Sequence, residues 1–427
     1  MESNIASRIK DVGNFIFLAL ILHGIGILIP WNMVINSGNF YINYKLKSET
    51  NSTSDLPELT WIRQNFYSII GTSSQTPNLL VTAANIYFPA KGGYKGLTRR
   101  ITFSMIVMIV TLLLNITFAL VDNSSWKLTW FALQLIIFVV LYVANGIYQN
   151  CVYGIAGRLP MKYSNAVVIG SNVCGSLVSI MAIVSHAISP NPLQEAIIYF
   201  SIATLIVIAC FIVLFFHESN AFYSYYMEKS EGPEQLALTN EKVIQDESIP
   251  YRQIFEKISV MCFNIFFVFW VTLFVFPSIT GNVDPYDKVF TSESKWFGQI
   301  FNFLFFNVSA MIGNLFPEYL PSTNISPHRV WIYVVARTIF IPFFFCCNYL
   351  TGVRSLPVLF GDIAFAVGIV LFGFTHGQGS SWAMMYAPKF VEDKHAGVAG
   401  MITAFFLVMG LFAGVHTGFA APFIVQL

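Results

Sequence analysis

Long apolar runs separated by short polar segments make up most of the chain. A membrane-spanning helix needs about 20 mostly apolar residues, and runs of this length recur from one end of the sequence to the other. They predict eleven spanning helices, over residues 12–35, 66–88, 101–121, 128–156, 164–187, 196–216, 258–281, 297–319, 330–350, 358–386 and 397–423. The pattern therefore predicts an all-α polytopic membrane protein.

One polar segment is much longer than the others. Residues 217–257 are polar and mixed in charge, and they divide the predicted helices into six and five. We expect an amino-terminal bundle over 1–216, a cytosolic linker loop over 217–257 and a carboxy-terminal bundle over 258–427. Such a 6+5 arrangement is typical of transporters in which two bundles rock against each other.

The composition agrees with a membrane protein and narrows the choice of partners. Hydrophobic residues make up 56% of the chain and charged residues only 11%, whereas soluble proteins carry about 25% charged residues. The net charge is +1 and no basic cluster is interleaved with aromatic residues, so we expect a lipid bilayer and no nucleic acid as partner. All six cysteines lie in apolar runs without a C-x-x-C pair, which argues against disulfides and zinc.

The loops predict an orientation. Fifteen Lys and Arg residues fall on the side of the amino terminus and seven on the other side, and such residues collect in the cytosol. We therefore expect a cytosolic amino terminus and an extracellular carboxy terminus. The first outer loop contains the triplet that begins at Asn51, which predicts N-glycosylation. No organelle address is evident, so the plasma membrane is the expected location.

Several kinds of chemistry have no recognisable residues in this sequence. Carboxylates are nearly absent from the middle of the spans, since Glu318 and Asp362 lie near helix ends, whereas proton-driven pumps usually need them there. No G-x-x-x-x-G-K-[ST] or H-E-x-x-H motif occurs. We therefore expect that the protein is not an enzyme and that it uses no ATP, metal or other cofactor. A facilitative carrier of an uncharged polar solute is the simplest interpretation.

Amide side chains interrupt the apolar runs in pairs that share a helix face. The pairs are Gln75 with Asn78, Asn145 with Gln149, and Asn307 with Asn314. Amides both donate and accept hydrogen bonds, so they suit a ligand such as a sugar or a heterocyclic base. The alternative is that they bond neighbouring helices to one another.

Two ring-bearing residues are further candidates for the substrate site. Trp31, next to Asn32, would provide an aromatic wall for a flat ligand, although tryptophan also anchors helices at membrane interfaces. His376 precedes Gly377 and Gln378 within the tenth run. A single histidine in a membrane helix is more often a hydrogen-bonded structural residue.

Several motifs together resemble the equilibrative nucleoside transporters. They are Gly24-Ile-Gly26-Ile-Leu-Ile-Pro30-Trp31-Asn32, Gly154-Ile-Ala-Gly157-Arg158-Leu-Pro160, Phe306-Asn307 followed by Gly313, Ala336-Arg337, Ala387-Pro388-Lys389 and Gly397-Val-Ala-Gly400. The resemblance implies a fold similar to the major facilitator superfamily. It also implies sodium-independent, bidirectional transport of nucleosides or nucleobases by alternating access.

The resemblance also implies which residues line the cavity. Those that match cavity positions of the family are Trp31, Ile35, Gln75, Asn78, Gln149 and Asn307. The family usually carries an Asp and an Arg, thought to hold the ribose, where this chain has Ala310 and Asn314. This departure predicts weaker ribose binding or a shift toward nucleobases. Asn145 stands where drug-sensitive relatives often have a small residue, which predicts poor sensitivity to bulky inhibitors.

Two alternatives to a nucleoside carrier remain open. One is a carrier of the same fold for a nucleobase or another small polar solute. An organic cation is disfavoured because a cavity for a cation would need an acidic residue. The other alternative is a membrane receptor or scaffold that transports nothing.

Overall fold

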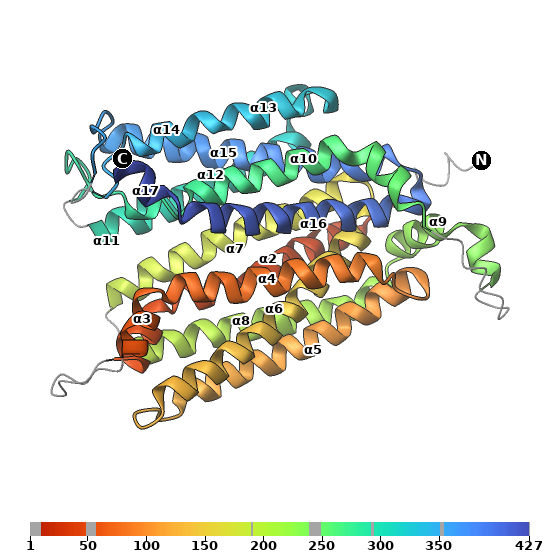
Figure 1. Cartoon of the computed structure of the whole chain (residues 1–427). Helices are drawn as coiled ribbons and strands as arrows, with labels where there is room; N and C mark the ends of the chain where they lie inside the picture. Colours follow the sequence, from red (N-terminus) through yellow and green to blue (C-terminus); the bar gives the residue numbers. More distant parts are fainter. Residues whose placement is uncertain are drawn as a thin grey trace.

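The computed structural model describes residues 10–47, 57–188, 191–238, 249–291, 294–350 and 354–426. Nearly all of these residues lie in helices, and the β-structure among them is an isolated bridge between Val283 and Tyr349. Figure 1 shows the long helices lying side by side along one common direction. The predicted all-α architecture is confirmed.

Six long helices form the part of the bundle that we call the amino-terminal half. They are α2 (Phe15–Asn36), α4 (Phe66–Tyr87), α5 (Gly93–Leu120), α6 (Lys127–Gly157), α7 (Met161–Ile188) and α8 (Pro192–His217). A short helix, α3 (Pro57–Gln64), precedes α4.

The carboxy-terminal half contains four longer helices and one span that is divided into two short helices. The longer helices are α10 (Tyr251–Val275), α12 (Phe305–Tyr319), α15 (Asp362–Tyr386) and α16 (Asp393–Gly418), and the divided span consists of α13 (Val330–Ala336) and α14 (Phe340–Phe345). The short helices α11 (Ser294–Phe297) and α17 (Ala421–Gln426) lie at one end of this half. A π-helical segment, Gly298–Leu304, leads into α12.

Ten segments among the described residues are long and apolar enough to cross a membrane. They match ten of the eleven predicted spans, and α4 (predicted as 66–88) does not reach the same hydropathy. Polar side chains such as Gln75, Asn78 and Asn85 lower its apolar content, yet α4 runs alongside the other helices (Figure 1). The count of eleven spans therefore depends on α4.

Several helices differ from their predicted bounds for identifiable reasons. Helix α5 begins at Gly93, and both Gly93 and the preceding Gly92 have positive φ. Its first turns are polar, so the apolar run at 101–121 is only part of it. The ninth span, predicted as one helix over 330–350, is divided into α13 and α14 by a 3-10 turn at Arg337–Ile339. Pro342 lacks an N–H and its ring crowds the carbonyl four residues earlier, which disfavours a continuous α-helix there.

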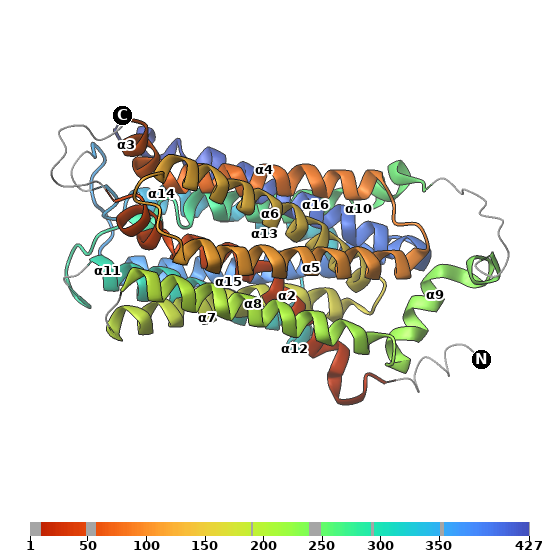
Figure 2. The ribbon, with the colours of Figure 1, turned by 90° about the horizontal axis from the view of Figure 1, so that it is seen from below.

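The segment expected as a linker loop contains a helix. Helix α9 (Ala221–Leu238) follows α8, and α10 already begins at Tyr251. Figure 2 shows α9 at one end of the bundle, and its Phe222, Tyr223 and Met227 side chains pack into the core of the amino-terminal half. We call this end of the bundle the α9 end.

The beginning of α2 and helix α17 lie at opposite ends of the bundle. Helix α2 begins at the α9 end, where the Tyr163 hydroxyl donates to Asp11 at 3.1 Å, and α17 lies at the other end together with α3 and α11 (Figure 1). This placement agrees with an odd number of traverses. Asn51, the predicted glycosylation site, lies outside the described residues.

The two largest of the four apolar cores among the described residues differ in where they lie. One is built mainly from the amino-terminal half and extends into α16 through Met401, Ala404 and Leu407. The other lies within the carboxy-terminal half and consists largely of phenylalanine side chains. Exposed leucine, isoleucine, valine and phenylalanine side chains along the outer helix faces form an apolar surface suited to lipid.

Candidate solute-binding site

Helices α4 and α6 approach each other closely beside four buried amides. Gln75 and Asn78 of α4 and Asn145 and Gln149 of α6 are each 5–7% exposed. Gly146 makes the approach possible, because a Cβ atom at this position would lie 2.5 Å from the Oδ1 atom of Asn78. The two predicted amide pairs thus lie on adjacent helices.

Polar groups in this region lack hydrogen-bond partners. Within the described part of the chain, the Gln75 Oε1, Asn145 Oδ1 and Tyr142 hydroxyl atoms are buried and unpaired, and the Gln149 amide forms no hydrogen bond with a described residue. An unpaired buried polar group costs about 1–3 kcal/mol, so proteins leave few of them. The structure thus leaves hydrogen-bonding capacity unused at these positions of α4 and α6. Asn78 differs, since its Oδ1 accepts from the Thr82 hydroxyl at 3.3 Å.

Trp31 lies near this group of amides. Its ring meets the ring of Tyr142 edge to face, with 6.1 Å between the centroids, and Tyr142 is one helical turn before Asn145 on α6. Trp31 and Ile35, on α2, are both half-buried. The structure thus places the predicted aromatic wall beside the α6 amides.

The two asparagines of α12 have different surroundings. Asn307 is half-buried against α7, where its Nδ2 donates to the Phe303 carbonyl at 2.9 Å and weakly to Ser179 Oγ at 3.4 Å. Asn314 is completely buried: its Oδ1 accepts from Ser381 at 3.1 Å and its backbone carbonyl accepts from Asn165 at 2.9 Å. Asn314 therefore joins α7, α12 and α15, and this geometry favours a packing role.

His376 belongs to a buried cluster in the carboxy-terminal half. Its Nδ1 lies 3.0 Å from the Thr272 hydroxyl, which also accepts from Arg337 at 2.9 Å. Arg337 is 2% exposed, and its guanidinium stacks over the Phe372 ring at 4.8 Å. Its described partners are all neutral oxygens, including the Val268 carbonyl at 3.0 Å.

Sequence reasoning did not select Arg337 as a site residue. The signal was present, because an arginine within an apolar run is costly in a membrane and usually marks a functional position. The structure shows that the guanidinium turns inward between α10, α13 and α15.

The two halves contact each other tightly at the α9 end. A Cβ on Gly157 of α6 would lie 2.7 Å from the Ala396 carbonyl, and one on Gly400 of α16 would lie 2.5 Å from the Tyr153 carbonyl. Asn150 of α6 donates to the Met401 carbonyl of α16 at 2.9 Å. Glycines thus allow α6 and α16 to meet backbone to backbone.

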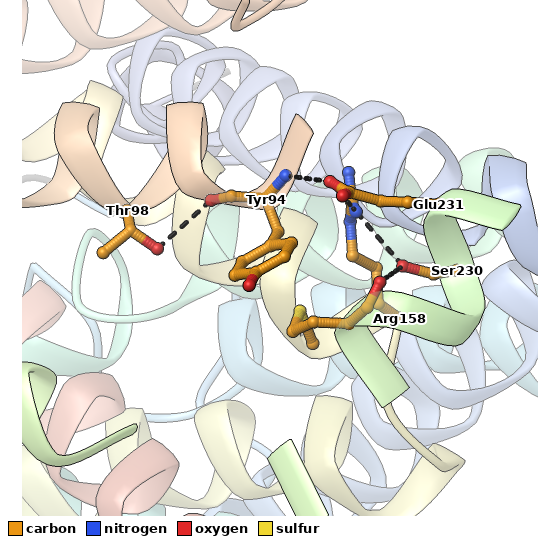
Figure 3. Close-up of polar contacts among 6 residues, drawn as sticks. Tyr94, Thr98, Arg158, Ser230 and Glu231 are labelled. Atoms are coloured by element: carbon orange, nitrogen blue, oxygen red, sulfur yellow. Dashed lines mark hydrogen bonds and ion pairs between the residues drawn. The ribbon is translucent and has the colours of Figure 1, made fainter. Parts of the chain in front are cut away.

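Helix α9 binds both halves at the same end. Figure 3 shows Glu231 of α9 between Arg158 and α5: its Oε1 lies 3.5 Å from Arg158 Nη1 and accepts from the Tyr94 N–H at 2.6 Å. Arg158 also donates to Ser230 Oγ at 3.1 Å. On the other side of α9, Lys229 pairs with Asp393 at the beginning of α16, at 2.9 Å. Helix α9 therefore connects α5 and α6 with α16.

A comparison with protein families supports the interpretation of these features. The family model described as nucleoside transporter matches residues 135–421, from α6 to α17. The chain belongs to the nucleoside transporter family. It is therefore a membrane transporter rather than an enzyme.

Relatives of this transporter match along almost its whole length. Equilibrative nucleoside transporter 3 of Rattus norvegicus is 24% identical, over 95% of this chain and 88% of its own length. Equilibrative nucleoside transporter 1 of Homo sapiens is 25% identical, over 95% of this chain and 96% of its own length.

Solved structures place the fold. The proton:xylose symporter XylE of the major facilitator superfamily superposes with a TM-score of 0.64 at 10% identity, over 97% of this transporter and 90% of XylE. The human organic anion transporter MFSD10 superposes with a TM-score of 0.52 at 14% identity, over 97% and 93% of the two chains. These likenesses establish a fold like that of the major facilitator superfamily.

Proposed function

We propose that this transporter moves nucleosides across a membrane down their concentration gradient, in both directions and without sodium. The proposal rests chiefly on the unpaired polar atoms on α4 and α6, at Gln75, Tyr142 and Asn145. The family match and the names of the relatives supply the substrate class.

The chemistry of the α4–α6 region suits a nucleoside. The edge of a base and the hydroxyls of a ribose offer both donors and acceptors, which is what amide side chains recognise. Trp31 and Tyr142 provide aromatic surfaces next to these amides, and stacking of a base on an aromatic ring contributes about 1–3 kcal/mol. In this proposal Gln75, Asn145 and Gln149 bind the polar edge of the solute.

Alternating access is the mechanism that agrees with contacts between the two halves at both ends of the bundle. The halves are closed at the α9 end by the α6–α16 contact around Gly157 and Gly400. Release of a solute at this end requires α6 and α16 to separate, while the α7–α12 contact around Asn307 changes at the other end. The buried Arg337 and His376 would move as one unit with the carboxy-terminal half.

A nucleobase is the second candidate substrate, and a specific observation supports it. Ala310 is completely buried, and Gly377 packs against its carbonyl, while Asn314 uses its amide to bond α7 and α15. Neither residue offers the charged contacts that the resemblance assigns to ribose binding. A substrate without ribose would not need them.

We further propose that the α9 end faces the cytosol and that the protein resides in the plasma membrane. The loops on the side of the amino terminus, which is the side of α9, carry most of the Lys and Arg residues. Such residues favour the cytosolic side.

Flux measurements in proteoliposomes test the proposal. Labelled uridine and adenosine should enter and leave the vesicles at similar initial rates, with equal rates in sodium and choline buffers. Labelled adenine and uracil test the second candidate under the same conditions. Flux that requires a sodium gradient would contradict the uncoupled mechanism, and no flux of any of the four compounds would favour a receptor or scaffold.

A further inference from the structure

A cavity of about 410 Å³ opens between α4, α5 and α6. It lies where α4 ends and α5 begins, which is the α9 end of the bundle. Its walls are largely apolar and include Val81, Ala84 and Ile147. The cavity is separate from the amide site, because neither Gln75 nor Gln149 lines it.

The rim of this cavity faces outward from the bundle. Phe88 and Phe103 both line the cavity, and they are 64% and 68% exposed. Large apolar side chains exposed on a membrane-spanning bundle face lipid rather than water. The cavity therefore opens toward the lipid, and its position at the end of α4 and the beginning of α5 puts it near the membrane surface.

Basic residues surround the same opening. Arg99 and Arg100 line the cavity, and Lys91 and Lys95 lie in the turn before them, with no acidic residue between positions 91 and 100. Among the described residues, none of these four side chains forms an ion pair with a carboxylate. Glu231, which reaches the beginning of α5, is already bonded to Arg158 and to the Tyr94 N–H.

The two arginines differ in how firmly they are held. Arg100 is half-buried and donates only to neutral oxygens, namely the Asn85 carbonyl at 3.3 Å, Asn85 Oδ1 at 2.5 Å and the Phe88 carbonyl at 2.7 Å. Arg99 is exposed and makes one bond of 3.3 Å, to the Lys91 carbonyl. Its guanidinium keeps most of its donors available for an anion.

We propose that this cavity binds an anionic phospholipid, with the phosphate at Arg99 and Arg100 and an acyl chain along Val81, Ala84 and Ile147. Guanidinium groups bind phosphate oxygens with charge-assisted bonds. Basic pockets between membrane helices are suited to anionic headgroups. The apolar walls and outward-facing phenyl rings select a lipid over a soluble phosphate. This site is independent of the proposed function.

Arg100 is a poor position for a test, since its bonds hold α5 to α4. Arg100 is also linked to the contact between the halves through hydrogen bonds. Its partner Asn85 donates to Asn150 at 2.7 Å, and Asn150 donates to the Met401 carbonyl. A loss of binding after its replacement would be difficult to separate from a loss of structure. Exposed residues and the cavity wall provide cleaner variants.

Native mass spectrometry of the purified full-length protein, titrated with phosphatidylserine, tests the charge requirement. Lys91→Gln combined with Arg99→Gln should weaken binding about 25-fold, at about fivefold for each basic residue removed. The matched control, Lys257→Gln combined with Lys389→Gln, removes two exposed charges elsewhere at the α9 end and should bind as the wild type does. Equal binding by the two double variants would overturn the proposal.

A second pair of variants tests the cavity itself. Ala84→Phe fills the apolar wall and should abolish binding of phosphatidylserine, whereas Ala83→Phe, an exposed position that does not line the cavity, should leave it unchanged. Phosphatidylcholine and the soluble headgroup glycerophosphoserine should both bind much more weakly than phosphatidylserine. If phosphatidylcholine or glycerophosphoserine binds as tightly as phosphatidylserine, the site does not select an anionic lipid. If Ala84→Phe and Ala83→Phe bind phosphatidylserine equally, the lipid does not occupy this cavity.

Discussion

Glu231→Gln is the substitution that tests how α9 is held. The glutamine keeps an oxygen that can accept from the Tyr94 N–H, but it removes the negative charge next to Arg158. Burial lowers the pKa of Arg158, and the Glu231 carboxylate opposes that shift. The variant therefore leaves a buried guanidinium without its carboxylate.

The structure sets the size of the effect. The Arg158 and Glu231 side chains are only 14% and 15% exposed, and a bond to a charged group that is protected from water contributes about 1.5–3 kcal/mol. A loss of about 2 kcal/mol corresponds to about a 30-fold increase in the open population of α9. The Lys229–Asp393 pair is 50% and 68% exposed, and such surface pairs contribute at most about 1 kcal/mol.

Hydrogen exchange of the α9 backbone in the purified full-length protein measures this opening. Glu231→Gln should speed exchange in α9 about 30-fold, while Asp393→Asn should change it severalfold at most. Glu228→Gln is the matched control, because it is the same change at an exposed position of the same helix. If Glu231→Gln and Glu228→Gln exchange at the same rate, the ion pair does not hold α9 in place.

Two further substitutions test the packing. Gly400→Ala places a Cβ 2.5 Å from the Tyr153 carbonyl and should lower thermal stability through overpacking of about 1–3 kcal/mol, whereas Gly71→Ala meets only Val415 Cγ1 at 3.4 Å and should be tolerated. Equal melting temperatures for these two variants in detergent would show that α6 and α16 are not in close contact. Asn314→Ala removes the bonds to Val168, Ser380 and Ser381 and should cost about 1–3 kcal/mol. Exposed Asn43→Ala is its control, and an unchanged melting temperature for Asn314→Ala would argue against a packing role.

The apolar pattern predicts most of the fold, because a span must be long and apolar wherever it meets lipid. It fails where other forces decide. Helix α9 places Phe222, Tyr223 and Met227 in the amino-terminal core and forms ion pairs with Arg158 and Asp393. These apolar residues stand in a polar, mixed-charge segment that is not apolar enough to predict a span. The break between α13 and α14 reflects Pro342, which the apolar run conceals.

In the candidate site, too, the sequence predicts the local features but not those that depend on packing. Helical spacing correctly places Gln75 with Asn78, and Asn145 with Gln149, on shared faces, because the 3.6-residue period is local. Whether an amide has a partner depends on the neighbouring helix, so Asn314 and Asn145 look alike in sequence but differ in the structure. The inward turn of Arg337 and the cavity beside Arg99 also arise from packing that no local pattern records.

Uridine binding to purified protein, measured by scintillation proximity together with the melting temperature, tests the central claim most directly. Gln149→Ala should weaken binding about 3- to 10-fold and leave the melting temperature unchanged, because its amide bonds no described residue. Gln134→Ala, on the same helix, loses a bond to Asn115 and should lower the melting temperature without changing the affinity. Wild-type affinity in Gln149→Ala, or the same response from both variants, would contradict a solute site between α4 and α6.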